Sequence, residues 1–341
     1  MEMLDLTVAV LQIRDSSFNI GLKMGKHIQN QPIIKNLEML TKPEIDYKNM
    51  KSIYSTFAPH LLDELQGLAE GMEIPLNKVA ALFSGYDVPK TEAMGCSAII
   101  TNEYYVRNYD FSPALYDSCF SLLQPENANA SAGYNLQAIG RHEGVNSQGL
   151  VIGLHFVSNS DYSKGLSAWT SIRMILDTCS TLEDAIQMLK EIPHSACYNF
   201  SLGDRKGNIA VVEASPEKVR VRREPLLLSC VNHFQDHDLE KKNRHFIEGS
   251  IKRNEYLQKF KDSQLTHREM FHNFANKDSP VFFTDYDNLF GTLHTFSYSF
   301  KDSRILTSIA QSNQILDINF EEWVNGNNIN YHILTGVIDD K

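Results

Sequence analysis

The chain lacks the features of several large protein classes. None of its 341 residues lies in an apolar run approaching 18 residues, so no membrane-spanning helix is predicted. The amino terminus, MEMLDLTVAVLQIRD, carries acidic residues where a secretory signal carries Lys or Arg, which favours a cytoplasmic location. A formal net charge of −10 does not suit a protein that binds a phosphate backbone, so no nucleic acid partner is expected.

Cysteines and the common catalytic motifs are also sparse. The chain has no C-x-x-C pair, and its odd number of cysteines predicts reduced thiols instead of a disulfide framework. The five are Cys96, Cys119, Cys179, Cys197 and Cys230. No G-x-G-x-x-G, G-x-x-x-x-G-K-[ST], G-x-S-x-G or H-E-x-x-H motif occurs, which argues against dinucleotide, P-loop, α/β-hydrolase and zincin chemistry. His233 and His237 have the spacing of a helical metal pair, but the apolar LLLSCV before them favours a strand end, so no metal is expected.

What the sequence does contain is a mixture of strand pairs and paired helices. Residues 4–13 read as a strand, and one face of a predicted helix carries Leu61, Leu65, Leu68 and Met72. Two capping-box patterns, Ser180–Glu183 and Thr266–Glu269, predict helix starts. Further strands are predicted within 96–111, 134–158, 198–234 and 291–310, and further helices within 21–30, 74–86, 166–190 and 250–260. Hairpins combined with paired helices indicate an α+β fold, with antiparallel sheets covered by helices.

Cys96 lies in EAMGCSAIITNEYYVRNYDF, residues 92–111, between Gly95 and a predicted hairpin turn. A cysteine is ordinarily a small buried hydrophobe. Arg107, however, lies where the returning strand comes back beside Cys96, and Asp110 lies three residues further, so a cation and a carboxylate could meet one thiol. No histidine is close in the sequence to act as base. Cleavage of the Gly95–Cys96 bond would supply one, because a new α-amine has a pKa of about 8.

The segment MGCSAI followed by RNYDF resembles the start of the mature chain in N-terminal-nucleophile (Ntn) amidases. These include the isopenicillin-N acyltransferases, the choloylglycine hydrolases and, more distantly, acid ceramidase. Three later segments resemble the same families in the same order: VNSQGLVIGLHF at 145–156, Asn232 in CVNHF, and Ser250 with Arg253 in SIKRNEYL. The segment before Cys96 is similar in length to that of the penicillin acyltransferases and ceramidases, whereas bile-salt hydrolases carry almost nothing there. Bile salts are therefore not expected as substrates.

The resemblance implies a role for each matching residue. Cys96 would be the nucleophile and, through its α-amine, the base. Arg107 would steady the thiolate, and Asp110 would hold the α-amine in place. Asn232 would donate its side-chain amide to the tetrahedral oxyanion, with His155 at the second oxyanion position, where bile-salt hydrolases usually carry asparagine.

Arg253 would pair within the site, although a solvated helix face is an equally simple interpretation of its position. The other residues have simple alternatives too. Arg107 and Asp110 could form a surface ion pair, Asn232 could be a turn residue, and His155 could be an ordinary sheet histidine.

The resemblance also implies a four-layer αββα sandwich, with two antiparallel sheets between helical layers. Residues 1–95 would form a largely helical prosegment that is cleaved from the catalytic domain, residues 96–341, but stays associated with it. The chemistry would be cleavage of a linear amide through a thioester on Cys96, by hydrolysis or acyl transfer and without a cofactor. The substrate would be a small N-acyl amide or an acyl donor, such as an acyl-CoA or a β-lactam.

Two other classes of protein stay open at this point. One is a cysteine enzyme that is never processed and uses His142, His155 or His233 as its base. The other is a catalytically silent binding protein on the same fold.

Overall fold

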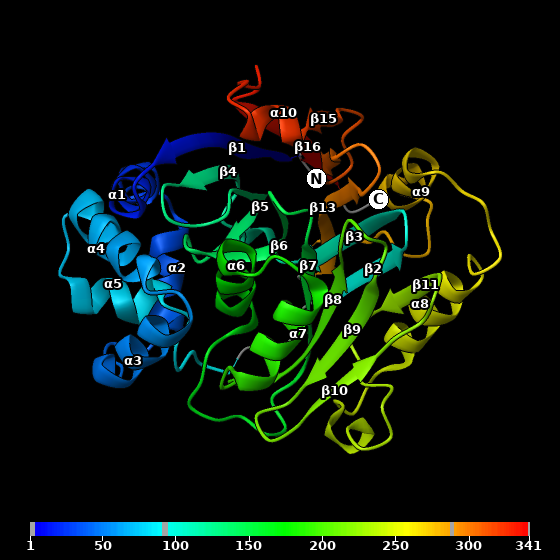
Figure 1. The fold of residues 1–341 in the computed structure, drawn as a ribbon, viewed down its shortest axis with the longest axis horizontal. Coiled ribbons are helices and arrows are strands. Elements are labelled where there is room, and N and C mark those ends of the chain that lie inside the picture. The colour runs from blue at the N-terminus through cyan, green and yellow to red at the C-terminus, as the bar shows by residue number, and fades with distance from the viewer. Residues whose placement is uncertain (1–3, 91–94, 287–289, 340–341) are drawn as a thin grey trace.

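The computed structural model describes residues 4–90, 95–286 and 290–339, and its centre is a pair of stacked β-sheets (Figure 1). Within these residues the larger sheet has nine strands and the smaller has seven. In spatial order, the larger sheet consists of β10 (Val219–Arg222), β9 (Ile209–Ala214), β8 (Cys197–Gly203), β7 (Val151–Ser158), β6 (Gly140–Asn146), β5 (Ser131–Leu136), β4 (Cys119–Pro125), β1 (Leu4–Asp15) and β16 (Ile333–Ile338). The smaller sheet consists of β11 (Leu227–Cys230), β2 (Gly95–Thr101), β3 (Tyr104–Phe111), β13 (Phe290–Ser299), β14 (Arg304–Ile309) and β15 (Leu316–Asn319), with β12 (Thr284–Asp285) paired to β13.

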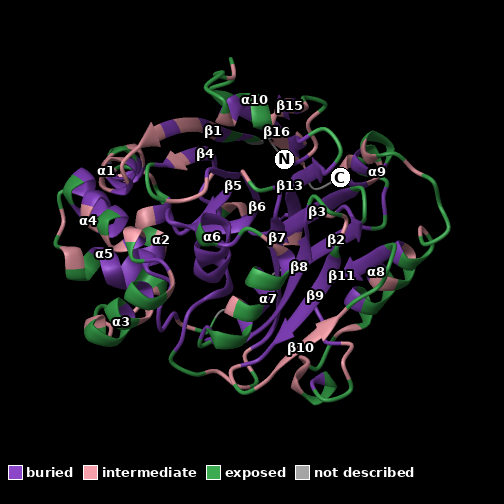
Figure 2. Ribbon diagram, viewed as in Figure 1, coloured by how far each residue is buried: buried purple, intermediate pink, exposed green. Residues whose placement is uncertain are grey.

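Helices cover the outer face of each sheet. Helices α6 (Ala168–Thr178) and α7 (Leu182–Glu191) pack on the larger sheet, and α8 (Glu248–Gln258) and α9 (His267–Ala275) pack on the smaller one. The inner faces meet where β2 contacts β7 and β8. Buried residues fill the strands between the helical layers, while exposed residues gather on the outer sides of the helices (Figure 2). The predicted α+β class and its αββα layers are confirmed.

The amino-terminal helices gather at one end of the molecule (Figure 1). They are α1 (Ser17–Ile28), α2 (Ile33–Leu40), α3 (Tyr47–Phe57), α4 (His60–Met72) and α5 (Leu76–Phe83). Helices α1 and α4 approach so closely that a Cβ atom on Gly21 would lie 2.0 Å from the carbonyl oxygen of Glu64. Glycine at this crossing therefore lets the two backbones touch. The predicted apolar face of α4 is buried along its whole length.

Strand β1 joins the amino-terminal region to the larger sheet, where it lies between β4 and β16. It runs antiparallel to β16 but parallel to β4. This pairing is a local departure from the two antiparallel sheets that the sequence predicts. Parallel neighbours need a long crossover connection, and here α1 to α5 and the β2–β3 hairpin lie between the two strands in the chain. Residues on both sides of Gly95 thus share one sheet.

A buried cluster of charges also links the amino-terminal region to the remainder. Arg173 on α6 pairs with Glu64 on α4 at 2.7 Å and with Asp177 at 2.8 Å. The Nε2 atom of His60, which begins α4, lies 2.9 Å from the Oδ2 atom of Asp177. Because unpaired buried charges are costly, these side chains fix the position of α4 on α6.

One predicted helix start is shifted by a residue. The N-cap of α7 is Thr181, and its capping box closes on Asp184, whereas the sequence pattern predicts a box at Ser180 and Glu183. Ser180 with Glu183 and Thr181 with Asp184 have the same spacing, so the sequence pattern alone does not determine which of the two residues is the N-cap. The predicted box at Thr266 and Glu269 is confirmed on α9.

The remaining short elements are η1 (Pro113–Leu115), η2 (Glu240–Lys242) and α10 (Phe320–Val324). Across the described residues, no helix combines the length and the apolar character needed to cross a bilayer. All five cysteines are free and buried.

Candidate active site

Cys96 is the second residue of β2, the first strand of a hairpin with β3. Every residue of both strands is buried, in keeping with their Ile, Val and Tyr content. The register places Cys96 opposite Tyr109 and Ala98 opposite Arg107. Arg107 is therefore diagonal to Cys96 on the same face and reaches it through its long side chain.

Arg107 binds the thiol directly. Its Nη2 atom lies 3.0 Å from the Sγ atom of Cys96 and donates at 2.6 Å to the carbonyl oxygen of Leu154. Its Nη1 atom forms an ion pair with Glu143, whose Oε2 atom also lies 3.1 Å from Nε2 of His294. All of these side chains are buried. The guanidinium is thus held on both sides, with one nitrogen directed at the sulfur.

Burial dominates the acidity of the thiol. Removal from water raises the pKa of Cys96 to about 11, although the nearby Arg107 acts in the opposite direction. In the continuous chain the thiol is therefore protonated at neutral pH. A base is required before it can act as a strong nucleophile.

Asp110 lies opposite Gly95 in the hairpin register and is buried. Its Oδ1 atom accepts a hydrogen bond of 2.7 Å from Thr292, while its Oδ2 atom has no hydrogen-bond partner among the described residues. Burial raises the pKa of this carboxyl to about 6. Asp110 and Arg107 are both buried and form no ion pair with each other in the described structure, so the surface ion pair is not what is found.

Asn232 and Arg253 hold the backbone of Cys96. The N–H group of Cys96 donates at 2.8 Å to Oδ1 of Asn232, which also accepts from Nη2 of Arg253 at 3.0 Å. Arg253 further donates at 2.6 Å to the carbonyl oxygen of Cys96. Arg253 lies on α8 but is buried, so the solvated helix face is also not what is found. The side-chain amide nitrogen of Asn232 donates at 2.9 Å to the carbonyl oxygen of Phe156.

The packing around Gly95 leaves no room for a side chain. A Cβ atom at this position would lie 2.5 Å from the ring of Phe290 and 3.0 Å from the Cβ atom of Asp110. Any larger residue would therefore push against the strand that carries the carboxylate.

The three histidines considered as bases differ in position. His155 lies beside the backbone of Cys96, with Nε2 at 3.0 Å from Oγ of Ser201 and Nδ1 unpartnered among the described residues. His142 is buried against the ring of Tyr109, and His233 binds Oγ of Ser250 through Nδ1. In the part of the chain that the structure describes, none of the three makes a hydrogen bond to the Cys96 sulfur. Burial lowers the pKa of each ring, to about 4 for His233.

Sequence reasoning missed Glu143, His294 and Thr292. Glu143 comes from β6 and the other two from β13, which lie far from Cys96 in the chain. The sequence offers one clue for Glu143, namely a carboxylate within the otherwise polar and glycine-containing strand segment RHEGVN. Nothing local marks His294 or Thr292.

Comparison with known proteins gives the following likenesses. A mutant of conjugated bile acid hydrolase from Clostridium perfringens is 17% identical with a TM-score of 0.47, covering 73% of this chain and 98% of that one. Penicillin V acylase from Agrobacterium tumefaciens is 16% identical with a TM-score of 0.40, covering 66% and 86%. The Caenorhabditis elegans orthologue of N-acylethanolamine-hydrolyzing acid amidase is 12% identical with a TM-score of 0.37, covering 61% and 95%. At these values the likenesses assign no activity to this chain.

None of the curated proteins compared with the chain matches it. A sequence profile does match, over residues 100–314, which is more than half of the chain. The profile describes the acyl-coenzyme A:6-aminopenicillanic acid acyl-transferases, and this chain belongs to that family.

Proposed function

We propose that this protein is a self-processing Ntn cysteine enzyme that cleaves linear amides through a thioester on Cys96, by hydrolysis or acyl transfer. The observation that carries the proposal is the set of groups around one cysteine. Arg107 contacts its sulfur, Asn232 accepts from its N–H group, and Arg253 donates to its carbonyl oxygen. These contacts fix the position of the Cys96 backbone nitrogen. A fixed position is needed if that nitrogen becomes the catalytic amine after cleavage.

The first reaction would release that amine. The Cys96 sulfur attacks the carbonyl carbon of Gly95, the new S–C bond forms, and the Gly95–Cys96 C–N bond breaks. The thiol proton passes to the departing nitrogen, which becomes the free α-amine. Water then hydrolyses the thioester, leaving a carboxylate on Gly95 and a thiol on Cys96. Residues 1–95 would stay bound, because β1 lies inside the larger sheet.

In the processed enzyme the α-amine accepts the thiol proton, and the sulfur attacks the carbonyl carbon of the substrate amide. The proton then passes to the leaving amine, and water or a second amine cleaves the thioester. An asparagine amide carries two N–H groups. One of those on Asn232 donates to Phe156, and we assign the other to the oxyanion of the tetrahedral intermediate.

Asp110 would bind the new α-ammonium group. It lies opposite Gly95, and its Oδ2 atom has no partner among the described residues. A buried carboxylate with an unused oxygen is costly in the uncleaved chain. A cation formed next to it on cleavage would satisfy that oxygen.

A second candidate is a cysteine enzyme that is never processed and uses His155 as its base. In its favour, the His155 ring is neutral and lies beside the Cys96 backbone, and its Nδ1 atom has no hydrogen-bond partner among the described residues. Against it, His155 makes its described hydrogen bond to Ser201 and not to the sulfur.

Intact-mass measurement separates the two candidates. Processing at Gly95–Cys96 would divide this 38.8 kDa chain into fragments of about 11 and 28 kDa, in proportion to their residue numbers. Cys96→Ala should stay whole, while Cys179→Ala, which removes another buried cysteine, should be cleaved like the wild type. The processed protein should then cleave members of a panel of N-acyl amines, penicillins and acyl-CoA donors. Wild-type protein that stays whole and is active on amides would leave only the His155 candidate.

A further inference from the structure

A row of polar side chains crosses the inner face of the larger sheet next to the candidate active site. His155 on β7 lies opposite Asn199 on β8, and Asn199 lies opposite Glu213 on β9. Residues directly opposite each other on neighbouring strands have their side chains on the same face of the sheet. All three are fully buried, where apolar side chains predominate. Buried polar groups need hydrogen-bond partners, and the reaction proposed above gives Asn199 and Glu213 no role.

The partner of this row is the segment 231–236, which carries Asn232. The segment follows β11 and belongs to no helix or strand, so no ladder of backbone hydrogen bonds fixes its position. The side-chain nitrogen of Asn199 donates to the carbonyl oxygens of Val231 and His233, both at 2.9 Å. One amide group on the sheet therefore holds the backbone on both sides of Asn232.

Glu213 holds the far end of the same segment. Its side-chain oxygens accept the backbone N–H groups of Gln235 at 3.1 Å and of Asp236 at 2.9 Å. The backbone N–H group of Asn232 donates at 3.0 Å to Oγ of Ser250. Side chains thus take the place of the backbone partners that a strand would supply.

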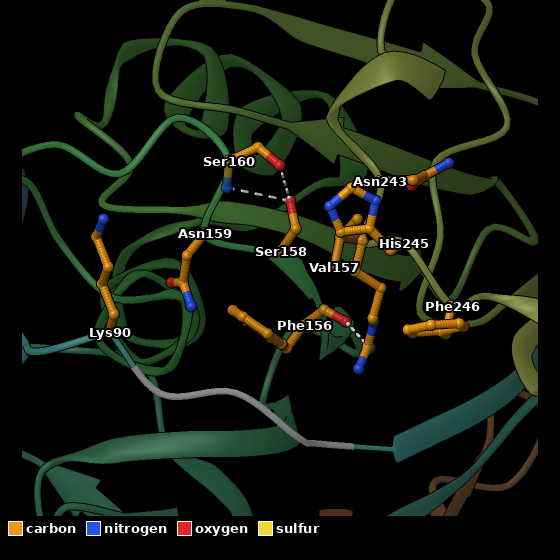
Figure 3. Close-up of a pocket in the computed structure, with 10 residues that line it drawn as sticks. Lys90, Phe156, Val157, Ser158, Asn159, Ser160, Asn243, His245 and Phe246 are labelled. Carbon is orange, nitrogen blue, oxygen red and sulfur yellow. Dashed lines mark hydrogen bonds between the residues drawn. The ribbon is translucent and has the colours of Figure 1, made fainter.

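The segment also adjoins open space. The carbonyl oxygen of Phe156 accepts from the Asn232 side chain, and the side chain of Asn243 binds both backbone groups of Phe234. Phe156 and Asn243 both line a cavity of about 580 Å³ (Figure 3). Because tight packing does not continue into a cavity, the position of the segment depends strongly on the hydrogen bonds from the sheet.

The orientation of Asn232 matters because its side chain makes all of its contacts at the site. Its Oδ1 atom accepts from the Cys96 nitrogen at 2.8 Å and from Arg253 at 3.0 Å, while its nitrogen donates to Phe156 at 2.9 Å. A shift of the backbone at Asn232 would move the N–H group assigned to the oxyanion. Groups that act in a transition state must be held to within about 0.5 Å.

We propose that Asn199 is a positioning residue, which directs the Asn232 amide at the reacting carbonyl by holding the carbonyl oxygens of Val231 and His233. This inference rests on the proposed function, because it takes Asn232 to stabilise the oxyanion. No hydrogen bond joins the Asn199 and Asn232 side chains in the part of the chain that the structure describes. Asn199 therefore acts on catalysis through the backbone of Asn232 and has no effect of its own.

A double-mutant cycle on processed protein tests the proposal, with the member of the amide, penicillin and acyl-CoA panel that the wild type cleaves fastest. Asn199→Ala should lower kcat by at least about tenfold, because a shift of about 1 Å in a positioned group can cost about a hundredfold in rate. KM should stay close to wild type, since the affected interaction forms in the transition state. In the Asn232→Ala background, Asn199→Ala should change kcat by less than about twofold. Residues that act independently would instead multiply their effects.

Asn146→Ala is the matched control. The side-chain nitrogen of this buried asparagine also donates to two backbone carbonyls, those of Leu176 and Cys179 at the end of α6. Asn146→Ala and Asn199→Ala should lower the midpoint of urea unfolding of the uncleaved Cys96→Ala chain to a similar extent, but Asn146→Ala should leave kcat close to wild type. If Asn199→Ala does not fold, Glu213→Gln takes its place in the cycle. This change loosens the same segment at nearly constant volume, because an amide has one accepting oxygen where a carboxylate has two.

The possible failures are distinct. An unchanged kcat, a raised KM with an intact kcat, or a loss of kcat that persists in full without Asn232 overturns the inference and leaves the proposed function standing. A chain that stays whole and cleaves amides contradicts the proposed processing, and the cycle is then measured on the whole chain. A chain that stays whole and cleaves no member of the panel overturns both.

Discussion

The Nη2 atom of Arg107 lies 3.0 Å from the Sγ atom of Cys96, while Nη1 of the same guanidinium pairs with Glu143. Both contacts are buried, and an arginine does not lose its proton in such surroundings. The sulfur thus has a permanent cation beside it, held by a carboxylate on its far side. Burial still keeps the thiol pKa at about 11 in the uncleaved chain, so the cation alone does not make a thiolate.

The first prediction concerns this contact. Arg107→Lys keeps the charge but loses the planar fork that binds Cys96, Leu154 and Glu143 together. We expect the midpoint pH for alkylation of Cys96 by iodoacetamide to rise by at least about one unit in the processed protein. Mass spectrometry of the Cys96 peptide measures this midpoint. Arg14→Lys, on β1, is the control. An unchanged midpoint in Arg107→Lys would show that the contact does not stabilise the thiolate.

The sequence predicted much of this site because its parts are local. Alternating apolar residues and a short polar turn were enough to place the hairpin that brings Arg107 and Asp110 near Cys96. The exact register of the hairpin was harder to predict from the sequence. Arg107 is not directly opposite Cys96 but diagonal to it, and it reaches the sulfur because its side chain is long. Asn232 and Arg253 came from a resemblance, because nothing in their local pattern indicates that β11 and α8 pack beside β2.

The parts that were missed depend on long-range packing. Glu143 meets Arg107 only because the two sheets stack, and His294 meets Glu143 from the opposite sheet. The apolar residues of β1 predict a strand, but its parallel pairing with β4 depends on how the intervening helices return the chain to the sheet. Periodicity identifies an element and its buried face, and it carries no information on which distant element covers that face.

The second prediction separates transition-state stabilisation from substrate binding. Asn232→Ala removes the amide assigned to the oxyanion, so kcat and kcat/KM should fall together by about a hundredfold while KM stays close to wild type. The same change removes the acceptor of the Cys96 N–H group and should slow processing. Only the cleaved fraction, isolated after long incubation, is suitable for kinetics. A raised KM with an intact kcat would instead make Asn232 a substrate-binding residue.

The third prediction concerns the buried ion pair between Glu64 and Arg173, which joins the segment before Gly95 to the segment after it. Glu64→Ala leaves Arg173 in the interior with Asp177 as its remaining carboxylate. Breaking a buried ion pair in this way costs about 3–5 kcal/mol, so the midpoint of urea unfolding should fall clearly in the uncleaved Cys96→Ala chain. Lys23→Ala, which breaks an exposed pair with Asp15, should change it little.

A related outcome follows after processing. With β1 in the larger sheet and Glu64 paired, the two fragments should elute together in size-exclusion chromatography. Glu64→Ala should release part of the smaller fragment. If the wild-type fragments separate spontaneously, the shared sheet and the buried pair do not hold them.

The last prediction uses the pH dependence of Asp110. Its pKa is raised by burial to about 6 in the folded chain, against about 3.9 for an unfolded aspartate. Between these values the folded chain binds the proton more readily than the unfolded chain, so this group's contribution to stability falls as pH rises from about 4 to about 6. A shift of about two units corresponds to about 3 kcal/mol. In the uncleaved Cys96→Ala chain, Asp110→Asn should therefore raise the free energy of unfolding at pH 7.5 by up to that amount, and by much less at pH 4.

Asp117→Asn is the matched control. Burial also raises the pKa of Asp117 to about 6, but both of its oxygens accept backbone N–H groups, from Gln137 and Ala138. That change should lower stability, since an amide offers only one accepting oxygen. If Asp110→Asn destabilises the uncleaved chain at pH 7.5, then the carboxylate already has a satisfactory partner there, and its assignment to a cation formed only on cleavage is wrong.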